Sequence, residues 1–219
     1  MQTKTLISVV ITDLDNTVYD WVSAFVPALY QMVREAATIL QVSEDALLDD
    51  LHEVHQRHGD SEHPYALLET RTVLDFCQRH PDLNPKVALD PAFHAFNRVR
   101  KVNLRLYDGV LLTLEHLHKL GIPIIAYTDA RVINSLFRLK RLSVRQFFAA
   151  LYAPQHSELS LNLSETEDGF VHLLDRDDRK PNPQTLIDIC SAYGVSPKSV
   201  LYMAPRYFKW VNWPARHRR

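Results

Sequence analysis

The chain has 219 residues, 46% of them hydrophobic and 23% charged, which is typical of a soluble globular protein with one sizeable core and room for a small accessory domain. No stretch approaches the ~20 apolar residues of a membrane span, and the first residues show no signal-peptide pattern, so we expect a cytoplasmic protein. Cys77 and Cys190 belong to no paired motif, which excludes a disulfide framework or a zinc knuckle. The formal net charge is −1, and basic residues without any acidic ones gather in 203–219, so the body is mildly acidic. That balance argues against a general nucleic-acid binder.

The apolar run 7–11 predicts a buried parallel strand, and it leads directly into Asp13-Leu14-Asp15-Asn16-Thr17. Active sites in open α/β sheets lie at the carboxyl ends of the strands. Asp13 and Asp15 share a face of an ideal strand, and like charges this close are best tolerated beside a cation. The pair therefore predicts a divalent metal site, with Mg²⁺ as the expected ion. An exposed turn after the strand is the alternative, since Asp and Asn favour turns.

Between Trp21 and Leu104 the apolar residues recur at helical spacing, and no strand signal interrupts them. The predicted helices cover 22–40, 43–59 with Ser43 as the N-cap, 64–80, and a segment that begins at Pro91. This segment therefore predicts a bundle of helices inserted after the first strand.

Three histidines on the second predicted helix resemble a metal site. His52 and His55 share a face, but a step of six residues places His58 away from His52, so the helix by itself offers no three-ligand site. We interpret these side chains as exposed histidines.

From Tyr107 onward, helices and strands alternate. Helices are predicted at 110–120, 132–139 and 183–193, and strands at 122–127, 151–153, 169–172 (an edge strand) and 199–203. The pattern indicates an α/β protein built from βαβ units.

Polar residues follow the second strand and precede the last helix. Thr128 and Asp129 come directly after the strand 122–127, and Lys180 stands just before the helix 183–193. Each has a plain structural alternative: Thr128 ends a strand, Asp129 caps the next helix, and Lys180 is a solvated lysine. Asp175, Asp177 and Asp178 are interpreted as a solvated loop with possible ion pairs to Lys180.

Taken together, these signals resemble the haloacid dehalogenase-like hydrolase superfamily, in its phosphatase branch with a helical cap. The motifs that carry the resemblance are 13–17, 124–128 and 180–183, and the return of the chain at 106–110 fits as well. The resemblance implies a Rossmann-like parallel-sheet core of residues 1–20 and 105–203. It also implies an inserted all-helical cap domain of residues 21–104.

The family's chemistry implies a role for each motif residue. Asp13 would be the nucleophile that forms an aspartyl-phosphate, and Asp15 would be the general acid and base. The Asp13 carboxylate and the Asp15 carbonyl would hold Mg²⁺. The substrate phosphate would be bound by the Thr128 hydroxyl, by backbone amides near Asp129 and Ala130, and by the catalytic Lys180 ammonium.

Position 15 distinguishes among reactions of the family. Dehalogenases of the family lack an Asp there, so Asp15 favours phosphoryl transfer. We therefore predict a Mg²⁺-dependent phosphomonoesterase for a small phosphorylated metabolite such as a nucleoside monophosphate, a sugar phosphate or flavin mononucleotide. No membrane or nucleic-acid partner is expected, and the oligomeric state stays open. A phosphorylated receiver domain is disfavoured by Asp15 and by the long insertion.

The family's fourth motif is missing. Members carry Gly-Asp after the strand that corresponds to 200–203, whereas this chain has Ala204-Pro205 and no acidic residue beyond Asp188. We expect weakened Mg²⁺ binding and a large loss of rate, because the ion neutralises charge on nucleophile and phosphate. The alternative function is therefore a catalytically impaired or non-catalytic protein or fragment of the same fold. Residues 204–219 form an atypical basic tail, which an altered C-terminus explains more fully than a nucleic-acid-binding arm.

Overall fold

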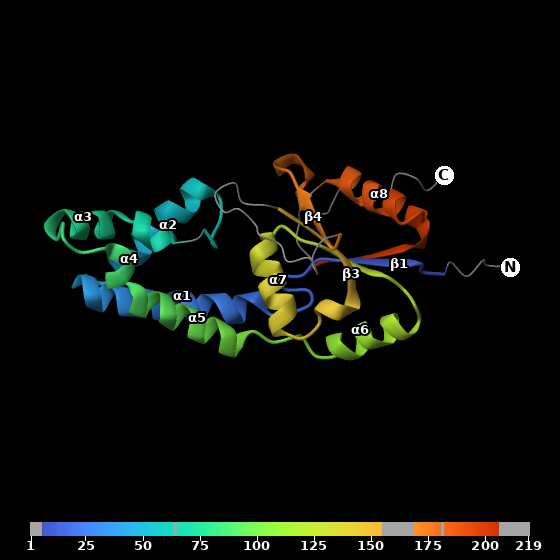
Figure 1. The fold of residues 1–219 in the computed structure, drawn as a ribbon, viewed down its shortest axis with the longest axis horizontal. Helices are drawn as coiled ribbons and strands as arrows, with labels where there is room; N and C mark the ends of the chain where they lie inside the picture. Colours follow the sequence, from blue (N-terminus) through green and yellow to red (C-terminus); the bar gives the residue numbers. More distant parts are fainter. Residues whose placement is uncertain (1–5, 64, 155–168, 181, 206–219) are drawn as a thin grey trace. The chain divides into compact units, whose positions relative to one another are not determined.

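The computed structural model describes residues 6–63, 65–154, 169–180 and 182–205 (Figure 1). The chain forms two compact units, one of Met1–Trp21 with Leu104–Arg219 and one of Val22–Asn103. We call the first the sheet unit and the second the helical unit. Within the described ranges, no helix combines the length and the apolar character needed to cross a bilayer. The basic tail beyond Pro205 and the segment 155–168 lie outside the described residues.

The sheet unit is built on five parallel strands in the order β4-β3-β2-β1-β5. The strands are β1 (Val9–Thr12), β2 (Ile124–Tyr127), β3 (Phe148–Pro154), β4 (Val171–Leu174) and β5 (Val200–Met203). Every residue of β1 and β2 is buried, as expected for strands of a parallel sheet that is covered on both faces. The predicted α/β, Rossmann-like fold class is confirmed.

Helices cover both faces of this sheet. The sheet unit contains α6 (Val110–Lys119), α7 (Val132–Arg141) and α8 (Pro183–Ala192), with short 3-10 turns at Arg145–Phe147, Arg176–Asp178 and Pro197–Ser199. Leu186, Ile189 and Cys190 of α8 pack against side chains of β1 and β2. Figure 1 shows α6 on the opposite side of the sheet from α8.

The strand boundaries differ modestly from those predicted. β3 runs from Phe148 instead of Leu151, and its pairing with β2 shifts register between Ile124 and Ile125. The predicted edge strand is β4, which pairs only with β3 in the strand order of the described sheet. Alanine is a weak strand former, so Ala149 and Ala150 did not indicate that the strand begins before Leu151.

The helical unit contains α1 (Trp21–Leu40) from its second residue onward, α2 (Glu44–His58), η1 (Ala66–Glu69), α3 (Arg71–Arg79), α4 (Pro85–Ala88) and α5 (Asp90–Asn103). Ser43 caps α2 by accepting a hydrogen bond from the Ala46 amide, and Gly59 ends it at a φ of 61°. Buried residues of α1, α2, η1, α3 and α5 share one core. No strand occurs among the described residues of this unit, as predicted.

The prediction of one helix over 64–80 is wrong. The segment divides into η1 and α3 because Thr70 has an extended backbone with φ −69° and ψ 146°. The Thr70 hydroxyl donates to the Leu67 carbonyl at 2.7 Å and accepts from the Val73 amide at 3.3 Å, which starts a new helix. The last helix of the unit begins at Asp90, one residue before the predicted Pro91.

Candidate active site

The chain turns sharply where β1 ends. The Asp13 amide donates to the Met203 carbonyl of β5 at 2.8 Å, so the strand pairing extends to the first carboxylate. Asn16 has a φ of 55°, a left-handed conformation that Asn adopts more readily than most residues. Its amide donates to the Tyr19 carbonyl at 2.9 Å. This compact turn fixes Asp13 and Asp15 at the carboxyl edge of the sheet.

Asp13 forms an ion pair with Lys180. Lys180 Nζ lies 2.5 Å from Asp13 Oδ1, and the two side chains are only 5% and 15% exposed. The Leu14 amide also donates to Oδ1, at 2.8 Å. Burial raises the pKa of the Asp13 carboxyl above its ordinary value, and Lys180 partly offsets this effect. Both of these contacts are made by Oδ1.

Asp129 holds the backbone that carries Lys180. Asp129 Oδ1 accepts a hydrogen bond from the Lys180 amide at 3.0 Å, across 51 residues of sequence. The Lys180 ammonium also lies 5.1 Å from the centre of the Tyr127 ring. Asp129 is therefore a positioning group for the lysine. It does not cap the next helix, because the N-cap residue of α7 is Arg131.

Thr128 and Ala130 form a turn at the end of β2. Thr128 is buried, and its amide donates to the Tyr152 carbonyl at 3.0 Å. Its hydroxyl oxygen accepts from the Ala130 amide at 3.1 Å. In this structure the predicted phosphate donor at Ala130 is therefore engaged within the turn. Because Thr12 pairs with Ala126, Thr128 stands one residue beyond the level of Asp13 on the neighbouring strand.

Asp15 forms its own ion pair, with Arg138 of α7. Arg138 Nη1 lies 3.0 Å from Asp15 Oδ1 and 3.3 Å from Oδ2. The Arg138 side chain is 3% exposed, whereas Asp15 is 24% exposed. The guanidinium also lies 5.9 Å from the centre of the Tyr19 ring. Burial and the nearby Asp15 raise the pKa of the Tyr19 hydroxyl well above its ordinary value. Each of the two carboxylates thus has a protein cation beside it.

Comparisons with known proteins agree with this arrangement. The family model of the haloacid dehalogenase-like hydrolases matches residues 7–203. The chain belongs to this family. A search of curated proteins finds no match.

Several solved structures share the family fold. One is a Thermotoga maritima protein assigned as a β-phosphoglucomutase, with 18% identity, a TM-score of 0.55, and coverage of 90% of this chain and 75% of that one. A phosphatase of the family from Thermococcus onnurineus has 18% identity, a TM-score of 0.53, and coverage of 90% and 76%. A 2-haloacid dehalogenase from Pseudomonas syringae has 21% identity, a TM-score of 0.51, and coverage of 90% and 77%. At these identities the likeness establishes the fold of this hydrolase.

Sequence reasoning missed Arg138 as a member of the hydrolase's site. The residue lies three positions after the buried Ser135 and next to the buried Leu139, so it stands on the core-facing stripe of α7. An arginine inside an apolar stripe was the available signal, because a buried arginine requires a paired acid. Nothing in the sequence identified Asp15 as that acid.

The position where the family carries its fourth motif lies at the same edge of the sheet. Thr12 pairs with Met203, so Ala204 follows β5 at the level of Asp13. Ala204 and Pro205 are partly buried and bring no ligand side chain. The sequence predicts the Asp13 carboxylate and the Asp15 carbonyl as the ligands of a hard cation at this point. They suit Mg²⁺ in kind, although carboxylates are few.

The acidic loop before Lys180 is structural in this hydrolase. The Asp178 carbonyl accepts from the Tyr127 hydroxyl at 2.8 Å and from the Thr185 hydroxyl at 3.0 Å. The Asp178 carboxylate accepts from the Asp175 amide at 3.3 Å, which closes a small turn. The sequence left open an ion pair between this loop and Lys180, but in the structure Lys180 forms its ion pair with Asp13.

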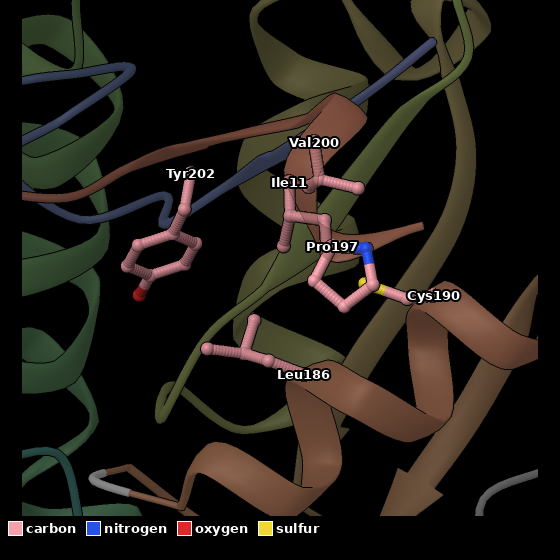
Figure 2. Close-up of a pocket in the computed structure, with 6 residues that line it drawn as sticks. All are labelled: Ile11, Leu186, Cys190, Pro197, Val200 and Tyr202. Carbon is pink, nitrogen blue, oxygen red and sulfur yellow. The ribbon is translucent and has the colours of Figure 1, made fainter. Parts of the chain in front are cut away.

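An apolar pocket of about 200 Å³ lies between α8 and the surface of β1 and β5 (Figure 2). It is lined by Ile11, Leu186, Cys190, Pro197, Val200 and Tyr202. None of the residues predicted for catalysis lines it, and Tyr202 supplies the one polar side-chain tip besides the Cys190 thiol. This pocket therefore carries none of the hydrolase chemistry.

Proposed function

We propose that this chain is a Mg²⁺-dependent phosphomonoesterase that acts on a small phosphorylated metabolite through an aspartyl-phosphate. The observation that carries the proposal is the Asp13 carboxylate. Its Oδ1 is anchored by Lys180 and by the Leu14 amide, which leaves Oδ2 for attack on phosphorus. A carboxylate that is held and oriented in this way suits covalent catalysis.

The proposed reaction has two steps. Asp13 Oδ2 attacks phosphorus, the bond to the ester oxygen breaks, and Asp15 gives that oxygen its proton. Asp15 then takes a proton from water, whose oxygen attacks the same phosphorus. The bond to Asp13 breaks and inorganic phosphate leaves. Lys180 would stabilise charge on the equatorial oxygens together with the Thr128 hydroxyl and the amides near Asp129 and Ala130, and the Ala130 amide would first leave the Thr128 hydroxyl oxygen.

The ion pair with Arg138 affects the proposed role of Asp15 as an acid. The guanidinium favours the ionised carboxylate, whereas proton donation to the leaving oxygen requires the protonated form. In the proposed reaction, Asp15 must therefore carry a proton before the ester bond breaks.

The cofactor and the cap belong to the same proposal. Mg²⁺ would be held by the Asp13 carboxylate and the Asp15 carbonyl, where it would neutralise charge on the nucleophile and the phosphate. We assign the helical unit the role of a cap that excludes water and selects small substrates. Nucleoside monophosphates, sugar phosphates and flavin mononucleotide are the proposed substrate classes.

The test is release of phosphate from p-nitrophenyl phosphate by the full chain in the presence of Mg²⁺. Asp13→Asn keeps the size of the side chain but removes the nucleophile, so we expect at least a ~1,000-fold loss of rate. Asp188→Asn, on the exposed side of α8, is the matched control and should keep the wild-type rate. A full rate in Asp13→Asn would overturn the proposal.

A second candidate function is favoured by Ala204 and Pro205, which stand where the family places its fourth motif. On this reading the chain is a catalytically impaired or non-catalytic member of the family. It predicts that the wild-type chain and Asp13→Asn release phosphate at the same background rate.

A further inference from the structure

We propose that His58, His63 and Glu69 form a binding site for Zn²⁺, or for a first-row transition-metal ion of similar preference, inside the helical unit. His58 is the last residue of α2, His63 lies in the following loop, and Glu69 ends η1. One potential ligand atom from each residue lies within 4.8 Å of the others. Two imidazoles and one carboxylate are a ligand set that zinc accepts.

The three side chains meet at the Glu69 carboxylate, where each histidine faces a different oxygen. His58 Nε2 lies 2.8 Å from Glu69 Oε2, and His63 Nε2 lies 2.6 Å from Glu69 Oε1. The two imidazole rings stack with their centres 3.5 Å apart and an angle of 8° between their planes. Zinc bonds of ~2.0–2.1 Å in tetrahedral geometry put neighbouring ligand atoms about 3.3 Å apart. To bind one ion, each N–O separation would open by less than about 1 Å, and the stacked rings would tilt so that both ring planes pass through the metal.

Metal binding requires that the hydrogen on each Nε2 atom facing Glu69 leaves that atom. An ionised carboxylate only accepts hydrogen bonds, so each Nε2 that contacts Glu69 carries a hydrogen. To ligate a metal, each imidazole moves that hydrogen to Nδ1 or, if it is protonated on both nitrogens, loses one hydrogen to water. No other covalent change is required.

The Glu69 carboxylate already accepts contacts from three basic side chains. The hydrogen bond from His58, followed by those from His63 and Arg57, lowers the pKa of Glu69 to about 2. Arg57 Nη2 lies 2.9 Å from Oε2, which leaves Oε1 on the side of the buried His63. The side chains of His63, His58 and Glu69 are 4%, 29% and 37% exposed, so one flank is open to water. Water on that flank supplies the fourth ligand of a tetrahedral site.

The local fold explains why these residues meet although the histidines of α2 alone do not. Gly59, with its positive φ, ends the helix and reverses the chain. The Asp60 carboxylate then accepts from the Glu62 amide at 2.7 Å, which brings His63 back over His58. His52 bonds to Gln56 at 2.8 Å and takes no part in the cluster.

The experiment is calorimetric titration of the metal-stripped full chain with Zn²⁺, in an Asp13→Asn background so that the carboxylates of the sheet unit contribute less. We expect one Zn²⁺ site in this parent. His58→Ala and Glu69→Gln should each weaken binding at least 10-fold, because each removes one of three protein ligands. His52→Ala, on the same helix, should leave the affinity unchanged. Circular dichroism without metal verifies that each variant is folded.

Two further measurements keep the test decisive. Co²⁺ in the parent should give the intense visible absorption of a four-coordinate site, and His58→Ala should lose it. Zn²⁺ should also raise the Tm of the parent but not of Glu69→Gln. A parent that binds no Zn²⁺, or ligand variants that bind it as tightly as His52→Ala, would show that the cluster is only a network of hydrogen bonds.

Discussion

Charged side chains at the carboxyl edge of the sheet are held in pairs. Asp13 lies against Lys180 and Asp15 against Arg138, so two acids two residues apart have separate protein cations. The sequence predicted a metal ion as the neutralising charge for both. In the structure, a protein cation beside each carboxylate already neutralises part of that charge.

Removing Arg138 should destabilise the fold measurably. Arg138→Met keeps much of the side-chain volume but leaves Asp15 without this cation. Breaking a fully buried pair costs ~3–5 kcal/mol, and the partial exposure of Asp15 lowers our expectation to about 2 kcal/mol. Urea denaturation measures the free energy of unfolding. Arg141→Met, exposed on the same helix, should change it by about 0.5 kcal/mol or less.

The same pair predicts non-additive effects. With Asp15→Asn already present, Arg138→Met should cost clearly less than in the wild type, because no ionised partner is left behind. Equal costs in both backgrounds would mean that Arg138 stabilises the fold independently of Asp15.

Elements were predictable where burial and periodicity agree. Both central strands and the helices α1, α2 and α8 lie close to the ranges that the apolar pattern indicates. The division of 64–80 into η1 and α3 was not predictable, because Thr70 interrupts the helix with two local hydrogen bonds and leaves the spacing of apolar residues unchanged. The partners of Arg138 and of His58 were not predictable either. Asp15 lies far from Arg138 in the sequence, and Glu69 follows the turn that begins after His58.

The hydroxyl of Thr70 should therefore stabilise the junction of η1 and α3. Thr70→Val keeps the shape but removes a buried group that caps Val73 and donates to Leu67. We expect a loss of about 1–2 kcal/mol in the free energy of unfolding. Thr70→Ser retains the hydroxyl and should lose less than half as much. A stability of Thr70→Val equal to wild type would show that the backbone forms this turn without the cap.

At the scale of the whole sheet unit, the strand order explains how distant motifs form one site. β1 lies between β2 and β5, so Asp13, Thr128 and Ala204 follow three neighbouring strands. Lys180 reaches the same edge because Asp129 holds its backbone. The order of the motifs in the sequence predicted this meeting, because parallel strands present their carboxyl ends together.

This topology makes the missing motif repairable. Met203 pairs with Thr12, so a carboxylate at position 205 would stand at the edge that holds Asp13 and Asp15. Ala204→Gly with Pro205→Asp should raise both Mg²⁺ affinity and the rate of phosphate release at least ~10-fold, since a further oxygen ligand holds the ion. Ala204→Gly with Pro205→Asn tests the same backbone change without the charge and should gain much less. Magnesium titration calorimetry and the p-nitrophenyl phosphate assay measure the two effects separately. A repaired chain that binds Mg²⁺ more tightly yet gains no rate would place the defect in the machinery around Asp13, since the ion would then be present without its chemistry.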